Sequence, residues 1–146
     1  MTFSPCLRAT SKIGSMSQGI PCTSTGKIAF VRGRQATTSP NAGGGWGLTG
    51  PTDIMLVDEN GGTPVPLAGA SNHAQGNYYP AYSPNGRFIA YTNSPSAQDT
   101  VAATDAQLRL AAADQSGMIS TLPNLNGQDG ASGFPTWSVD GRFLSF

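Results

Sequence analysis

The sequence predicts an all-β protein built from repeated units of antiparallel strands. The segment Tyr79–Tyr91 recurs 55 residues later as Phe134–Phe146, with identical Pro, Ser, Gly, Arg and Phe at matching positions. A repeat of this length is typical of repeat architectures. The 146 residues include 19 Gly and 11 Pro, so turns are frequent. No stretch longer than about ten residues has a helical period.

Each copy of the repeat predicts a β-hairpin. An aromatic-rich strand runs into Asn85-Gly86 in the first copy and Asp140-Gly141 in the second. These dipeptides are strong hairpin signals, because both of their residues tolerate a positive φ. The residues that follow each glycine alternate as a returning strand should.

The chain before the first full copy predicts a leader and then part of an earlier unit. Residues 1–25 are expected to be a poorly ordered leader or linker, since they are rich in Ser and Thr and lack periodicity. Strands are expected at 27–33, 53–59 and 63–68. The two prolines of the last segment suit an outer edge strand, where a missing backbone donor is tolerated.

The middle of the chain predicts one complete four-stranded unit, at about residues 78–122. Its strands are expected near 78–83, 86–93, 106–113 and 117–122. The alanines at 111–113 also fit a helix, but the nearby Gly117 and the similarity to 53–67 favour a strand. A further unit begins with strands at 134–138 and 142–146.

Four-stranded units repeated radially are the blades of a β-propeller, so we predict an incomplete propeller of about two and a half blades within residues 26–146. Closed propellers contain about four to eight blades. We therefore expect the chain to be a fragment, a truncated gene product or one segment of a larger propeller. Exposed blade edges and faces predict marginal stability and self-association.

The repeat motif resembles that of the TolB-like propeller family, which is centred on Pro-x-Trp-Ser-Pro-Asp-Gly. The matching segments are 79–91 and 134–146, with a weaker match at 53–68, and Val139 stands where the family usually has Pro. This resemblance implies a bacterial protein that is periplasmic or secreted and contacts a protein partner. No signal peptide is visible in the sequence.

The composition argues against a nucleic-acid-binding protein and against a membrane-spanning protein. The net charge is zero and 11% of the residues are charged, which argues against a nucleic-acid partner. No apolar run reaches the ~18 residues that span a bilayer. The two cysteines, Cys6 and Cys22, do not by themselves imply a disulfide.

The long connections at 34–52, 69–77, 94–105 and 123–133 are expected to share one face of the sheets, where binding usually resides. The candidate binding residues on this face are Trp46, His73, Tyr78, Asp99 and Asp129.

No catalytic, cofactor or metal site is expected. His73 is the sole histidine and the sequence has no Gly-x-Ser-x-Gly motif. The Gly43-Gly44-Gly45 segment lacks the Lys-Ser/Thr of a phosphate loop, and Asp58-Glu59-Asn60-Gly61 lacks the later Glu of a calcium loop.

The repeated side chains are interpreted as structural. Arg87 and Arg142 are expected to cap the edge of each unit. The aromatic residues are expected to fill the core between units. They are Tyr79, Tyr82, Phe88, Tyr91, Phe134, Trp137, Phe143 and Phe146.

The sequence favours a non-catalytic propeller scaffold that mediates a protein–protein interaction. One alternative is the propeller part of a prolyl-oligopeptidase-like serine peptidase whose catalytic domain lies outside this sequence. Another is a remnant without function. The coding sequence after Phe146 would separate the first two, because a peptidase requires Gly-x-Ser-x-Gly followed by Asp and His.

Overall fold

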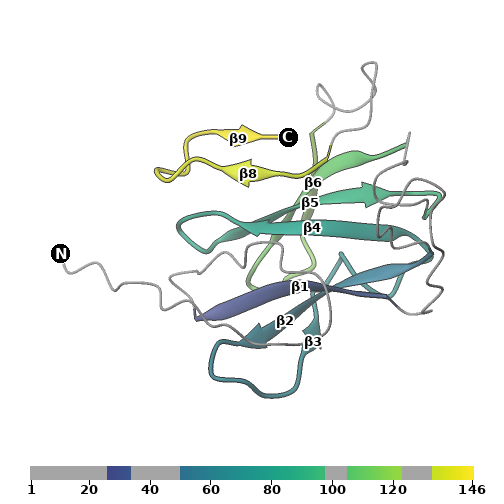
Figure 1. Ribbon diagram of the computed structural model, residues 1–146, viewed down its shortest axis with the longest axis horizontal. Coiled ribbons are helices and arrows are strands. Elements are labelled where there is room, and N and C mark those ends of the chain that lie inside the picture. Colours follow the sequence, from purple (N-terminus) through teal and green to yellow (C-terminus); the bar gives the residue numbers. More distant parts are fainter. Residues whose placement is uncertain (1–25, 34–49, 98–104, 123–132) are drawn as a thin grey trace, which may run out of the picture.

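The computed structural model describes residues 26–33, 50–97, 105–122 and 133–146, and the regular secondary structure in these residues is entirely β-strand (Figure 1). The predicted all-β class is therefore confirmed for this part of the chain. The predicted leader 1–25, both cysteines, Trp46, Asp99 and Asp129 lie outside the described residues.

The strands form three antiparallel sheets, which we name A, B and C. Sheet A contains, in hydrogen-bonded order, β1 (Lys27–Gly33), β2 (Thr52–Asp58) and β3 (Val65–Pro66). Sheet B contains β4 (Gly76–Tyr82), β5 (Phe88–Ser94), β6 (Gln107–Ala112) and β7 (Ile119–Thr121). Sheet C contains β8 (Thr136–Trp137) and β9 (Leu144–Ser145). All nine strands fall where the sequence predicts strands, including β6 with its alanines.

The three sheets lie one above another, with β4 between the β1–β2 pair and β8 (Figure 1). Sheets A and B share one apolar core. It is made of Ala29, Ile54, Leu56, Leu67, Ala70, Tyr82, Ile89, Tyr91 and Ala111. Because side chains alternate along a strand, these residues occupy one face of each sheet, and the two faces meet.

This alternation corrects the prediction that all eight repeated aromatic residues fill the core. Tyr82 and Tyr91 are buried against sheet A. Phe88 points to the other side of sheet B and is 38% exposed, and its counterpart Phe143 is 66% exposed. The guanidinium groups of Arg87 and Arg142 lie over these two rings, at 5.8 and 5.7 Å from the ring centres.

The hairpin turn also differs from the prediction. Only the glycine of each pair has a positive φ, +68° at Gly86 and +69° at Gly141. The backbone N–H of Gly86 donates to the carbonyl of Ser83 at 2.8 Å, so the turn spans Ser83 to Gly86. A negative φ at its third residue, Asn85, excludes the turn types that require a positive φ there and leaves type I.

Side chains explain this wider turn. The Ser83 hydroxyl accepts the N–H of Phe88 at 3.0 Å and donates to Oδ1 of Asn85 at 2.8 Å. The same Asn85 oxygen accepts the N–H of Arg87 at 3.0 Å. The turn thus satisfies three donors: the Ser83 hydroxyl and the backbone N–H groups of Arg87 and Phe88.

The first strand of sheet B, β4, contains a bulge that the sequence did not reveal. The pairing of β4 with β5 shifts between Tyr78 and Ala81. Within the bulge, Tyr79 has a φ of +53°, and its repeat counterpart Phe134 has +55°. Such a φ is rare for a bulky residue. The two rings lie 4.2 Å apart between centres, so the same unusual backbone in both copies brings two aromatic rings into contact.

Candidate binding site at the loop end of sheets A and B

The strand ends that flank the long connections lie at one end of sheets A and B. The register pairs Gly33 with Thr52, Gly76 with Ser94, and Asn93 with Gln107. The segments that join these strand ends therefore leave the sheets at the same end, which we call the loop end. The tight turns lie at the opposite end.

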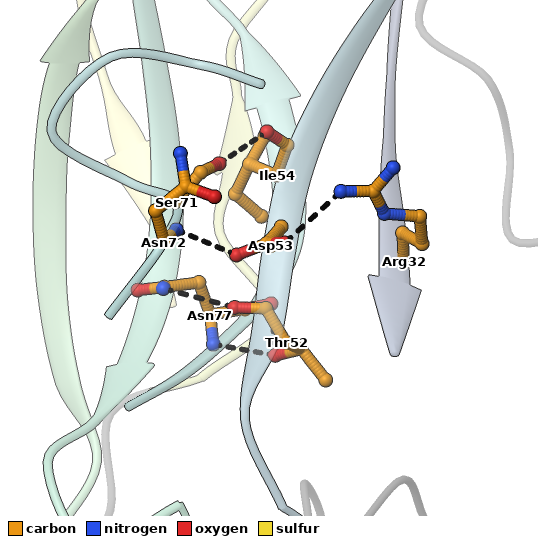
Figure 2. A network of polar contacts seen from close by, with 7 residues as sticks. All are labelled: Arg32, Thr52, Asp53, Ile54, Ser71, Asn72 and Asn77. Carbon is orange, nitrogen blue, oxygen red and sulfur yellow. Dashed lines mark hydrogen bonds and ion pairs between the residues drawn. The ribbon is translucent and has the colours of Figure 1, made fainter. Parts of the chain in front are cut away.

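Asp53 is the central charged group at the loop end (Figure 2). Its side chain is fully buried, yet it lies beside Arg32, whose side chain is 52% exposed and whose Nη2 is 3.3 Å from Oδ2 of Asp53. Its other oxygen accepts the N–H of Asn72 at 2.7 Å. The Ser71 hydroxyl donates to the carbonyl of Ile54 at 2.7 Å. These contacts fasten the β3–β4 connection to β2.

Thr52 and Asn77 join sheet A to sheet B at the same end (Figure 2). The Thr52 hydroxyl donates to the carbonyl of Asn77 at 2.9 Å and accepts the N–H of Asn77 at 2.7 Å. The Asn77 amide donates to the carbonyl of Thr52 at 3.2 Å. Both residues are 1% exposed, so their polar groups are satisfied by each other in place of water.

Asn93 extends this network within sheet B. Its amide nitrogen lies 3.0 Å from Oε1 of Gln75 and 2.9 Å from Oδ1 of Asn77. All three residues belong to strand ends or connections at the loop end. The network therefore links the start of β4 to the end of β5.

Four buried polar side-chain atoms of β5 and β6 have no hydrogen-bond partner within the described residues: Oη of Tyr91, Oγ1 of Thr92, Oδ1 of Asn93 and Nε of Arg109. The register pairs Tyr91 directly with Arg109, which places both side chains on the same face of sheet B. Burial raises the pKa of the Tyr91 hydroxyl, and the neighbouring Arg109 guanidinium opposes this effect. Burying a polar atom without a hydrogen bond destabilises the folded state, so these atoms lower the stability of the core.

Asp105 closes the β5–β6 connection. Its carboxylate accepts the hydroxyl of Ser94 at 2.7 Å and the backbone N–H of Ser96 at 2.7 Å. Burial pushes the pKa of Asp105 upward, but the hydrogen bonds from Ser96 and Ser94 outweigh it, so the pKa lies below the ordinary value of 3.8. The charged carboxylate thus holds the two ends of this connection together.

Of the five predicted binding residues, the structure describes two. His73 is exposed in the β3–β4 connection, and its Nε2 is 3.2 Å from the carbonyl oxygen of Gly69. Tyr78 is 1% exposed, and its hydroxyl donates to the carbonyl of Gly50 at 3.3 Å. His73 is available to a partner at the loop end, whereas Tyr78 packs inside it. Their roles in binding stay predictions.

Most of the polar side chains described at the loop end hydrogen-bond to one another or to the backbone. Within the described ranges, no group of three His, Cys, Asp or Glu side chains is arranged to hold a metal ion. No helix long and apolar enough to cross a membrane is found in the same ranges. The arrangement fits a rigid base that presents loops.

Sequence reasoning identified the loop end but missed its network. Thr52, Asp53, Asn77 and Asn93 come from three strands, and only the strand register brings them together. The one sequence signal for this network was that these polar residues stand next to apolar positions in predicted strands.

Comparison of the chain with protein-family models and with curated proteins finds no match in either case.

Proposed function

We propose that the chain is part of a TolB-like β-propeller and serves as a non-catalytic scaffold that binds a protein partner in the bacterial envelope. The partner contacts the loop end, where the connections between blades are long. Sheets A, B and C correspond in this proposal to three successive blades.

The observation that carries the proposal is that the two copies of the motif use the same side chains in the same way. In the second copy, the Ser138 hydroxyl accepts the N–H of Phe143 at 2.9 Å and donates to Oδ1 of Asp140 at 2.7 Å. That oxygen accepts the N–H of Arg142 at 3.1 Å. These contacts match those of Ser83, Asn85 and Arg87, so the motif is a structural element that recurs in sheets B and C, and such recurrence supports the proposal of repeated blades.

The loop end supports a binding role. Its backbone is fixed by buried polar contacts, and its connections are longer than the turns at the other end. Rigid sheets that present long loops are a common basis for recognition. Thr52, Asp53 and Asn77 are engaged in hydrogen bonds that join strands and connections, which fits a scaffold better than a catalytic centre.

Site-specific photo-crosslinking in a bacterial host with exported full-length chain tests the proposal. A photoreactive amino acid at His73 probes the loop end, and the same amino acid at the exposed Thr63 probes the opposite end as a matched control. We expect a discrete protein adduct from position 73 and none from position 63. Equal adducts from both positions, or no adduct from either, would contradict the proposed binding face.

The peptidase alternative is tested separately by reading the coding sequence that follows Phe146. A Gly-x-Ser-x-Gly segment followed by Asp and His would replace the scaffold proposal with a peptidase. Further blades without such a segment would support the scaffold.

A further inference from the structure

Two described turns contain asparagine followed by glycine, at Asn60-Gly61 and Asn85-Gly86. A third such pair, Asn126-Gly127, lies outside the described residues. Asparagine before glycine is the pair most prone to spontaneous deamidation, because glycine has no side chain to shield its backbone nitrogen. The two described pairs both lie at the end of the sheets opposite the loop end, so their surroundings can be compared directly.

Deamidation requires only the asparagine side chain, the next backbone nitrogen and water. The glycine nitrogen attacks Cγ, a new C–N bond closes a five-membered succinimide ring, and the Cγ–Nδ2 bond breaks. Nδ2 leaves as ammonia with the proton that the glycine nitrogen gives up. Water then cleaves the ring at Cγ, which gives aspartate, or at the backbone carbonyl carbon, which gives isoaspartate. Contacts that stop the side chain from turning toward the glycine nitrogen slow the reaction.

The Asn85 side chain is held in its turn by two hydrogen bonds to one atom. Its Oδ1 accepts the Ser83 hydroxyl at 2.8 Å and the backbone N–H of Arg87 at 3.0 Å. Ser83 is 3% exposed. Rotation of the Asn85 carboxamide would take the acceptor away from both donors, one of them on a buried residue, and this costs free energy.

The Asn60 side chain is held by a single exposed contact. Its Nδ2 donates to Oδ1 of Asp58 at 3.1 Å, and its own Oδ1 accepts no hydrogen bond within the described residues. The glycine nitrogens do not differ in this way. Gly61 donates to the carbonyl of Asp58 at 2.9 Å, and Gly86 donates to the carbonyl of Ser83 at 2.8 Å. The difference between the two turns therefore lies in how firmly each asparagine side chain is held.

We propose that Asn60 is a spontaneous modification site that converts through a succinimide to aspartate and isoaspartate, while Asn85 is protected by its turn. The conversion places a carboxylate beside Asp58 and Glu59 and removes the amide donor that Asp58 accepts. The Asp58 carboxylate also pairs with Lys27, at 3.7 Å between Oδ2 and Nζ. The modification thus changes the charge of the turn that joins β2 to β3. It is independent of the proposed binding scaffold, which uses the opposite end of the sheets.

Peptide mapping by mass spectrometry tests the site on the full chain, incubated at mildly alkaline pH in heavy-oxygen water, which marks the conversions that occur during the incubation. In native buffer we expect Asn60 to convert at least about fivefold faster than Asn85, since one more hydrogen bond must be released at Asn85. The matched control is the same chain unfolded in guanidinium chloride, in which the two pairs should convert at similar rates. Equal rates in the folded chain would overturn the inference, as would a preference for Asn60 that persists unchanged after unfolding.

Two further measurements test the mechanism. Ser83→Ala removes one donor from Oδ1 of Asn85, so the rate at Asn85 should rise toward the rate at Asn60 under conditions in which circular dichroism shows a folded chain. An unchanged rate at Asn85 would count against the proposed protection. An isoaspartyl methyltransferase with labelled S-adenosylmethionine should methylate the converted peptide that contains residue 60, because this class of enzyme esterifies the free carboxylate of isoaspartate. A converted peptide that takes up no label would refute the succinimide route, since direct hydrolysis of the amide gives aspartate alone.

Discussion

Tyr79 offers a direct test of the bulge that the two copies share. Its φ of +53° lies in the left-handed region, and Phe134 repeats it at +55°. A residue with a Cβ atom pays about 1–2 kcal/mol for this backbone, whereas glycine does not. In an ordinary strand the alanine variant is the more stable one, because glycine costs about 0.5–1 kcal/mol relative to alanine.

We predict that Tyr79→Gly is more stable than Tyr79→Ala, by about 0.5–1 kcal/mol. Both variants lose the ring contact with Phe134, which is 4.2 Å between centres. That common loss, about 0.5–1.5 kcal/mol beyond the buried area, cancels in the comparison. Urea unfolding followed by circular dichroism measures the difference directly.

Ala90→Gly is the matched control, because Ala90 lies in β5 and has no positive φ. It should destabilise the chain by about 1 kcal/mol, the ordinary cost of glycine in a strand. If Tyr79→Gly were as unstable as or less stable than Tyr79→Ala, the strained bulge would be refuted.

Three further predictions concern hydrogen bonds and charge. Ser83→Ala should cost about 1–3 kcal/mol and Ser138→Ala about 0.5–1 kcal/mol, because the two serines make the same contacts but only Ser83 is buried; equal costs in urea unfolding would contradict this. Tyr91→Phe should leave stability unchanged or raise it by up to about 1 kcal/mol, since its hydroxyl has no partner within the described residues, and a clear loss would reveal a partner. Because the folded pKa of Asp105 is lowered, its stabilisation is complete above the unfolded pKa of 3.8 and is lost as the pH falls through the folded value. Asp105→Asn should therefore have a shallower decline in stability with acid than the wild type, and parallel declines would count against the Asp105 contacts.

The strands could be predicted from the sequence because the repeat and its turn residues are local signals. Asn85-Gly86 fixed the place of the hairpin, and the edge position of β3 followed from its prolines. The turn type could not be predicted from that dipeptide alone. It depends on Ser83 and Asn85 taking up backbone donors, which is a property of side-chain geometry.

The burial of the repeated aromatic residues is a second feature that could not be predicted from the sequence. Phe88 and Tyr91 are three positions apart in one strand, so they point to opposite faces. Tyr91 faces sheet A, and Phe88 faces the side that sheet C covers only in part. Similar residue types in a repeat therefore have different burial, because burial depends on what packs on each face.

The loop-end network was the least predictable feature. Asp53 is a single carboxylate in an apolar strand, and its partners Arg32 and Asn72 lie 21 and 19 residues away. Only the register of β1 with β2, and the return of the β3–β4 connection, bring these groups together. Loop lengths indicated which end of the sheets would carry the long connections, but not which side chains would join the strands there.

The central claim is that successive repeats stack face to face, and nuclear magnetic resonance of the Tyr79–Phe134 and Trp137–Ala81 contacts tests it most directly. The stack predicts cross-relaxation between the rings of Tyr79 and Phe134, and slow solvent exchange of the Trp137 indole proton, which donates to the carbonyl of Ala81 at 3.1 Å. Absence of that cross-relaxation together with free exchange of the indole proton would contradict the stacked arrangement.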